Sequence, residues 1–199
     1  MPKYGFISAS MAKDVMTNGR GKDNPFGATF MTRAHHVGAG RVGYDTSTDI
    51  SHLASVEWGN EQQWVATEAY QDATMATVHS VEKWHQLEDR FGCTVDGLVG
   101  EDGMIEIKCP NSINHLRNVL YNEQLDDYIH QIQFSLWITG RQWCDFISFD
   151  SRAPIGLQLH VHRVERDEVA IAELKERAGV MDIEADRIAE LLRTKMETK

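Results

Sequence analysis

An aspartate, a glutamate and a lysine stand close together in the middle of this chain of 199 residues. Asp96 is followed by a glycine, and Glu106 and Lys108 come ten and twelve residues after it. The segment between them contains Gly-Glu-Asp-Gly at residues 100–103, which favours a tight turn because glycines and acidic residues tolerate the backbone angles of short turns. We therefore expect a β-hairpin with strands over residues 93–99 and 104–109.

Side chains along a strand alternate between its two faces, so Glu106 and Lys108 share one face while Ile105 and Ile107 share the other. An unpaired charge on an interior strand is costly, and Asp96 on the adjacent strand can bring its carboxylate close to Glu106. Two carboxylates beside a lysine suit a hard cation such as Mg²⁺, which takes oxygen ligands and completes its shell with substrate phosphate. The alternative is a surface Glu–Lys pair and a turn aspartate, because Glu-x-Lys is common by chance.

The surrounding pattern must supply elements that position this hairpin. A region rich in glycine and basic residues, 18–44, predicts a long loop with a brief helix at 28–34. Periodicity predicts helices at 7–17, 49–72, 112–120 and 125–138, further strands at 75–83, 144–149 and 156–164, and a C-terminal helix at about 167–199, broken near Gly179. This order indicates an α/β fold in which a central mixed β-sheet is flanked by helices, formed by a single domain over residues 1–199.

Composition narrows the class of protein without deciding it. With 42% hydrophobic and 25% charged residues, the chain has the make-up of an ordinary soluble globular protein. Its formal net charge of −10 argues against a nucleic-acid binder, because phosphate contacts need a basic surface, but it does not say where the charges lie. Three cysteines without paired short spacing do not support a disulfide framework or a thiolate metal site. The sequence has no apolar run of bilayer length, so we expect a reducing, cytoplasmic setting.

The full pattern from Asp96 to Pro110 resembles the catalytic motif of the PD-(D/E)xK nuclease superfamily, with Val95 where the motif usually has proline. Within that superfamily the chain is similar to the phage lambda exonuclease type, also called the viral recombinase or alkaline exonuclease family. The likeness spans nearly the whole chain through residues 5–10, 59–70, 96–110, and 128–140 with 149–152. It implies a restriction-endonuclease-like core.

The resemblance also implies roles for individual residues. Asp96, Glu106 and the backbone carbonyl of Ile107 would hold Mg²⁺, with two ions as the expected complement and Mn²⁺ able to substitute. Lys108 would orient or help deprotonate the attacking water, and Gln131 would lie near it in the active site. The resemblance places Ser10, Thr94 and Lys3 in a pocket for a 5′-phosphate and makes Arg20 a DNA contact. The alternatives are a helix cap for Ser10 and a solvated terminus for Lys3.

One active-site position departs from the family. The alignment of Gly59, Ala66 and Tyr70 puts Gln63 where the family usually has a glutamate. Glu61 lies about 200° round the helix from that position, so it cannot substitute unless the helix is distorted or the register differs. We therefore expect weaker binding of one metal ion, or a lower rate, than in relatives with glutamate.

Together these features predict a Mg²⁺-dependent exonuclease that degrades one strand of duplex DNA from a 5′-phosphorylated end. It would release 5′-mononucleotides and leave a 3′ single-stranded tail for phage-type recombination. The resemblance implies a ring-shaped homotrimer around DNA, encoded by a phage or prophage, with a single-strand annealing protein as partner. Two alternatives remain, namely an endonuclease of the same superfamily and a DNA-end-binding protein whose site has decayed, for which Gln63 is the hint.

Overall fold

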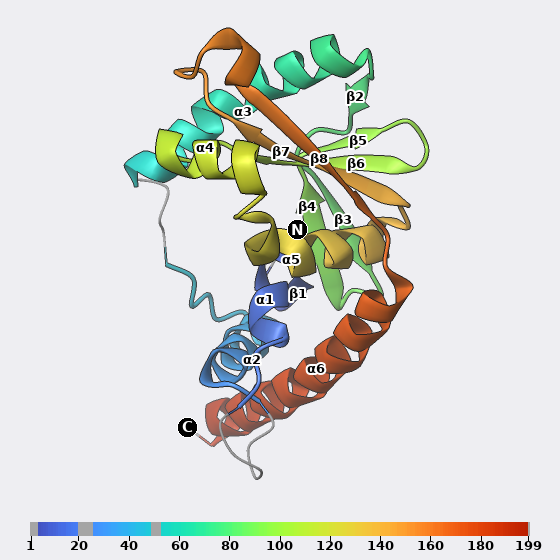
Figure 1. The fold of residues 1–199 in the computed structure, drawn as a ribbon. Coiled ribbons are helices and arrows are strands. Elements are labelled where there is room, and N and C mark those ends of the chain that lie inside the picture. The colour runs from blue at the N-terminus through green and yellow to red at the C-terminus, as the bar shows by residue number, and fades with distance from the viewer. Residues whose placement is uncertain (1–3, 20–25, 49–52, 199) are drawn as a thin grey trace.

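The strands form two sheets in the computed structural model, which describes residues 4–19, 26–48 and 53–198 (Figure 1). A three-stranded sheet has the order β1-β4-β3, and a five-stranded sheet has the order β2-β5-β6-β7-β8. In the larger sheet β6 and β7 run parallel, and the other neighbours pair antiparallel. The strands are β1 (Ile7–Ser8), β2 (Val78–His79), β3 (Lys83–Leu87), β4 (Phe91–Val95), β5 (Gly97–Val99), β6 (Gly103–Lys108), β7 (Trp143–Phe149) and β8 (Leu159–Glu165).

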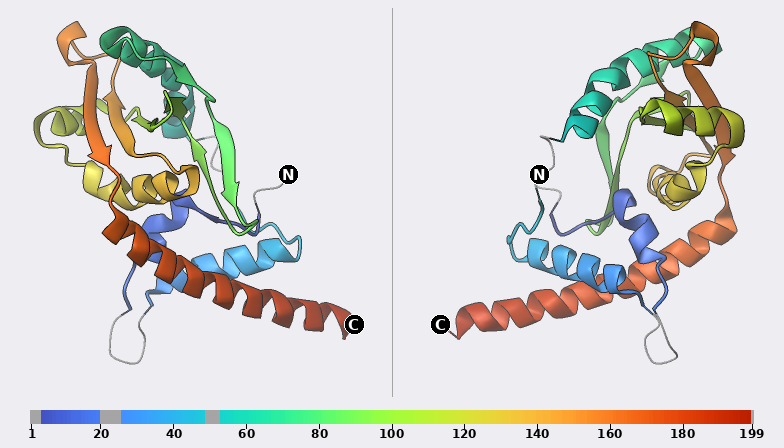
Figure 2. Two further views of the ribbon diagram at one scale, coloured as in Figure 1. Left: turned by 90° about the vertical axis from the view of Figure 1, so that its right-hand side faces the viewer. Right: turned by 60° about the vertical axis from the view of Figure 1, so that its left-hand side comes forward.

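Helices cover both faces of the larger sheet. The α-helices are α1 (Ala12–Val15), α2 (Ala28–Arg41), α3 (Ala54–Thr74), α4 (Ser112–Tyr121), α5 (Leu125–Thr139) and α6 (Glu168–Glu197), with short 3₁₀ turns at Ala9–Met11 and Ile155–Leu157. Helix α3 lies against β6, β7 and β8 on one face, and α5 lies on the other, where it also contacts β4 and β3 (Figures 1 and 2). The expected α/β class, with mixed sheets flanked by helices, is confirmed. In the described part of the chain, none of the helices combines the length and the apolarity that a membrane span requires.

Each face of the larger sheet has its own hydrophobic core. Ile105 and Ile107 of β6 pack with the buried Tyr70 of α3 on one face. Met104 of the same strand packs with Phe146 and the buried face of α5 on the other. The alternation predicted for β6 is therefore correct, and it turns Glu106 toward α5.

The strand predicted over residues 93–99 is wrong in one respect that affects the site. The chain bends at Asp96 and divides this segment into β4, which belongs to the smaller sheet, and β5, which belongs to the larger. The strand predicted at 75–83 is likewise replaced by β2 and the start of β3. Asp96 thus lies where the chain passes from one sheet to the other.

Helix α2 is twice as long as the predicted 28–34 segment. Its glycines, which suggested a loop, lie inside the helix at points where other backbone or side-chain atoms approach closely. A β-carbon at Gly38 would lie 2.8 Å from the carbonyl oxygen of Ala185 and 2.8 Å from the side chain of Ile188. One at Gly40 would lie 2.4 Å from the amide nitrogen of Gly5. Gly38 therefore allows α2 to lie directly along α6, as Figure 2 shows, and Gly40 allows the backbone at Gly5 to approach α2.

The break predicted in the C-terminal helix is also wrong, since α6 runs unbroken from Glu168 to Glu197. A single glycine costs only about 1 kcal/mol in a helix interior, and the burial of side chains such as Leu174 and Met181 outweighs that cost. At the other end of the chain, the helix predicted over 7–17 is instead β1, a 3₁₀ turn and the short α1.

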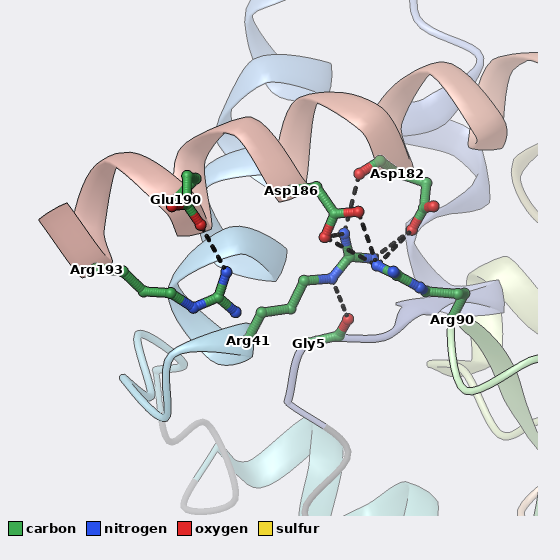
Figure 3. Close-up of polar contacts among 7 residues, drawn as sticks. All are labelled: Gly5, Arg41, Arg90, Asp182, Asp186, Glu190 and Arg193. Carbon is green, nitrogen blue, oxygen red and sulfur yellow. Dashed lines mark hydrogen bonds and ion pairs between the residues drawn. The ribbon is translucent and has the colours of Figure 1, made fainter.

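An ion network joins the start of the chain to α6 (Figure 3). The Arg41 guanidinium, whose side chain is only 9% exposed, binds the carboxylates of Asp182 and Asp186 and donates to the carbonyl of Gly5 at 3.2 Å. Arg90, which precedes β4, binds Asp186 at 2.9 Å. The network therefore fixes the segment that leads into β1 against α2 and α6.

Gly38 of α2 and Gly179 of α6 make a matched pair of substitutions. We expect Gly38→Ala to lower the free energy of unfolding by about 2 kcal/mol, because the added methyl group collides with α6. Gly179→Ala adds the same group where nothing lies within 4 Å, so it should raise stability by up to about 1 kcal/mol. Urea unfolding of both variants measures these changes, and equal effects would contradict the packing described for α2.

Candidate active site

The bend at Asp96 directs its carboxylate to the edge of β6. Its Oδ2 accepts a hydrogen bond of 2.6 Å from the backbone amide of Ile107, and its Oδ1 accepts one of 3.2 Å from the side-chain amide of Gln63 on α3. Pairing of Gly97 with Ile105 places Asp96 beside Glu106 across the hairpin. Residues from β4–β5, β6 and α3 thus meet at one carboxylate.

Glu106 is the second carboxylate, and its side chain is only 3% exposed. Its Oε1 accepts hydrogen bonds of 2.7 Å from the Lys108 ammonium and of 2.7 Å from the side-chain amide of Gln131 on α5. The Lys108 nitrogen also lies 4.5 Å from the centroid of the Tyr128 ring, one turn before Gln131 on the same helix. Within the described residues Oε2 of Glu106 makes no hydrogen bond, so it is available to a ligand.

The two acidic groups are electrostatically coupled. Burial, together with the nearby charge of Glu106, raises the pKa of Asp96 to about 7, although the Ile107 amide and Lys108 oppose the rise. Burial alone would lower the pKa of Lys108, but the charge and hydrogen bond of Glu106 outweigh it and hold the pKa above its ordinary value. Lys108 is therefore a cation at neutral pH, and the pair of carboxylates lacks a full complement of positive charge.

A cavity of about 440 Å³ opens onto this cluster from the side of β1. Besides Asp96, Glu106, Lys108 and Gln131, it is lined by the hydroxyl-bearing residues Ser8, Ser10 and Thr94. The hydroxyls of Ser8 and Ser10 lie 2.9 Å apart, and the Ser8 side chain does not cap the 3₁₀ turn that contains Ser10. The hydroxyls and the acidic cluster therefore face one space.

A second cavity, of about 570 Å³, lies on the α3 side of the same cluster. Asp96 and Lys108 line both cavities, so they stand at the junction between them. Gln63, Tyr128, Trp58 and Arg152 belong to the second cavity. A chain-like substrate could pass from one cavity to the other across Asp96 and Lys108.

The structure brings together most of the residues singled out from the sequence. Eight of them meet around the junction of the two cavities: Ser10, Gln63, Thr94, Asp96, Glu106, Ile107, Lys108 and Gln131. Glu61 is exposed, whereas Gln63 reaches Asp96, which supports the alignment that puts Gln63 at the family's glutamate position. Lys3 and Arg20 lie outside the described residues.

Three further residues line the cavities and were not predicted as site residues: Ser8, Trp58 and Arg152. Ser8 could have been predicted from the sequence, because it stands two residues before Ser10, which was singled out. Arg152 lies in a segment that resembles the family, yet nothing in its neighbours along the chain indicates that it reaches α3.

The donor set around Asp96 and Glu106 fits a hard divalent cation. Its atoms are carboxylate oxygens, and the coupled acids need added positive charge. No group of three or more His, Cys, Asp or Glu side chains suited to a metal is found among residues 4–19, 26–48 and 53–198. Two carboxylates with a backbone carbonyl would leave several positions for water and phosphate oxygens, as is usual for Mg²⁺.

This fold and this acidic site with a lysine are compatible with a nuclease, and comparisons with known proteins support an exonuclease role. Residues 3–142 match the YqaJ-like viral recombinase domain, so the chain belongs to that family. An alkaline exonuclease (LHK-Exo) from Laribacter hongkongensis has a TM-score of 0.85 and 31% identity, with 98% of this chain and 95% of that chain covered. The structure of LHK-Exo in complex with dAMP gives a TM-score of 0.82 at 31% identity, covering 98% and 94%.

A third structure, a phage related exonuclease from Haemophilus somnus 129PT, has a TM-score of 0.76 at 14% identity and covers 94% of this chain and 96% of its own, which shows the shared fold. A search of curated proteins found no match. Family and fold together support a DNA exonuclease.

The coupling of the two carboxylates predicts how stability depends on pH when a chelator is present. The pKa of an aspartate in the unfolded chain is about 3.9, whereas that of folded Asp96 is about 7. Between these pH values the folded protein binds more protons than the unfolded chain, so the wild-type protein loses stability as the pH rises. Asp96→Asn keeps an acceptor for Ile107 and avoids this loss. We expect its stability advantage to grow from near zero at about pH 4 to roughly 4 kcal/mol at about pH 8, as a shift of about three pKa units implies.

Asp150→Asn is the control, because the same chemical change should act in the opposite direction. Burial raises the pKa of Asp150, but hydrogen bonds from Arg152 and Ser112 outweigh it and lower the pKa to about 2. This variant should therefore be less stable than the wild type at about pH 8 and recover as the pH falls below about 4. Thermal unfolding across this range measures both, and a stability loss in Asp96→Asn at high pH would contradict the coupling.

Proposed function

We propose that this protein is a Mg²⁺-dependent exonuclease that degrades one strand of duplex DNA from a 5′-phosphorylated end and releases 5′-mononucleotides. The observation that carries the proposal is the cluster at the junction of the two cavities. There Glu106 binds Lys108 and Gln131, and Asp96 stands beside them. The product would be a duplex with a 3′ single-stranded tail, the substrate that phage-type recombination requires.

Asp96, Glu106 and the Ile107 carbonyl would hold the metal against the scissile phosphate. When bound, Mg²⁺ lowers the pKa of water and stabilises charge on the attacking and leaving oxygens. Lys108 would turn from Glu106 to orient the water and offset the phosphate charge. Gln131 would fix Glu106 through its 2.7 Å hydrogen bond, and so position the lysine as well.

The cavity lined by hydroxyls suggests where the 5′ end binds. Ser10 and Thr94 can donate hydrogen bonds to a terminal phosphate. The cavity volume of about 440 Å³ is in the usual range for a small-ligand site. A terminal nucleotide seated there would place the next phosphodiester at Asp96 and Lys108. Lys3 and Arg20 remain part of the proposal as contacts to the 5′-phosphate and the DNA.

The assembly proposed for this nuclease is a homotrimeric ring that encloses duplex DNA, with a single-strand annealing protein as partner. Enclosure would reconcile DNA binding with a net charge of −10, because basic segments can line the channel while acidic residues face outward. Light scattering in solution tests the trimer directly through the mass of the particle.

Nucleotide release tests the reaction. We expect wild-type protein with Mg²⁺ to release acid-soluble nucleotides from linear duplex, faster from 5′-phosphorylated than from 5′-hydroxyl ends. Lys108→Ala should lower the rate by at least ~100-fold, because it removes the group that orients water. Lys195→Ala, on the exposed end of α6, is the matched control and should be fully active.

The same assay separates the alternatives. Cutting of closed circular duplex would favour an endonuclease of the same superfamily. Binding to DNA ends without release of nucleotides under any metal would favour an end-binding protein with a decayed site.

Gln63 provides a test of metal binding. Gln63→Glu puts a third carboxylate 3.2 Å from Asp96, so it should lower the free energy of unfolding by about 1 kcal/mol in chelator. With Mg²⁺ it should gain more thermal stability than the wild type and turn over faster. Gln62→Glu is the control, since its side chain accepts a 2.6 Å hydrogen bond from Ser151 and a carboxylate can do the same. An unchanged response to Mg²⁺ in Gln63→Glu would contradict the assigned metal position.

A further inference from the structure

The second cavity has a charge balance that is unusual for this chain. Its lining residues include two cations, Lys108 and Arg152, and a single carboxylate, Asp96. The whole chain, in contrast, carries ten more acidic than basic side chains. Both cations are ion-paired, Lys108 with Glu106 and Arg152 with Asp150, so an anionic ligand would be bound by the exposed part of the Arg152 guanidinium and not by a net positive charge of the cavity.

Arg152 is held rigidly at this cavity. Its Nε donates to Asp150 at 2.7 Å, and Asp150 is fully buried. Its guanidinium lies 4.4 Å from the centroid of the Trp58 ring, and Nη2 reaches the carbonyl of Pro110 at 3.4 Å. The side chain has therefore lost most of its rotamer freedom before any ligand binds, which favours tight and oriented contacts.

Part of the guanidinium remains free for a ligand. The side chain is 49% exposed, and within the described residues Nη1 has no hydrogen-bond acceptor. Asp150 and Pro110 are bound through Nε and Nη2 only. A pre-oriented fork with unused donors is the geometry that binds phosphate oxygens.

We propose that Arg152, braced by Trp58 and Asp150, binds a phosphodiester of the degraded strand on the 3′ side of the scissile bond. The proposal rests on the proposed function, which seats the terminal nucleotide in the hydroxyl-lined cavity. Since Asp96 and Lys108 line both cavities, the strand that continues beyond the scissile phosphate enters the cavity of Arg152. Arg152 thus holds the part of the strand that stays with the enzyme after each cleavage.

Neutral phosphodiester analogues locate this contact. A single methylphosphonate is placed at each of the first four internucleotide positions of the degraded strand, and single-turnover rates give the half-saturating DNA concentration. We expect one position beyond the scissile bond to weaken wild-type binding roughly tenfold. Arg152→Gln should bind the unmodified duplex as weakly as the wild type binds the duplex with that methylphosphonate. A methylphosphonate at that position should then weaken the binding of Arg152→Gln no further, whereas the other positions keep their effects. The binding of this variant should also depend less on salt, by about one unit of the log–log slope.

Two variants and one condition isolate the phosphate contact from a purely structural role. Arg117→Gln removes a half-exposed arginine of α4 outside this cavity and should match the wild type. Arg152→Lys keeps the charge, so it should keep the sensitive position even if Arg152→Gln does not fold. Dissociation constants of the same duplexes, measured at equilibrium in chelator, report the phosphate contact without turnover.

The outcomes separate the two proposals. Equal sensitivity to methylphosphonate in wild type and Arg152→Gln, or a loss of thermal stability with unchanged DNA binding, would overturn the role of Arg152. Absence of nucleotide release by the wild type would overturn the proposed function, and the binding measurements would still decide the contact.

Discussion

The site depends on two carboxylates, Asp96 and Glu106, that lie close together where little water can screen them. Glu106 shares one oxygen between Lys108 and Gln131, and Asp96 is left with hydrogen bonds and a raised pKa. Like charges at such a place are tolerated only when the fold holds cations or donors against them. The bend between β4 and β5 brings Asp96 to its donors, and the register of β6 brings Lys108 to Glu106. Gln131 of α5 supplies the remaining donor to Glu106.

The parts of the fold that follow from local pattern were predictable. The period-two alternation of β6 gave both of its faces, and helical periodicity located α4 and α5 to within a residue or two. The bend at Asp96 was not predictable, because the residues on either side of it form one continuous strand pattern and only tertiary pairing assigns them to different sheets. The same limit applies to Gly38, which signals a loop along the chain and serves close helix packing in space.

The candidate site shows the same division. Asp96, Glu106 and Lys108 are linked by spacing within one hairpin, and Gln63 and Gln131 follow from resemblance to a family. Arg152 was missed because its contact with Trp58 joins the loop after β7 to the first turns of α3, almost a hundred residues earlier in the chain. A cation–π contact between residues so far apart in the chain leaves no periodic trace in the sequence.

We infer that Asp96 and Glu106 bind one divalent cation between them. Anomalous diffraction from crystals soaked in Mn²⁺, recorded on both sides of the manganese absorption edge, tests this directly, because only the metal's signal changes across that edge. We expect a peak bounded by the Asp96 carboxylate, Oε2 of Glu106 and the Ile107 carbonyl, with Lys108 displaced from Glu106. A strong peak elsewhere with this position empty, or Lys108 still bound to Glu106 at saturating metal, would contradict it.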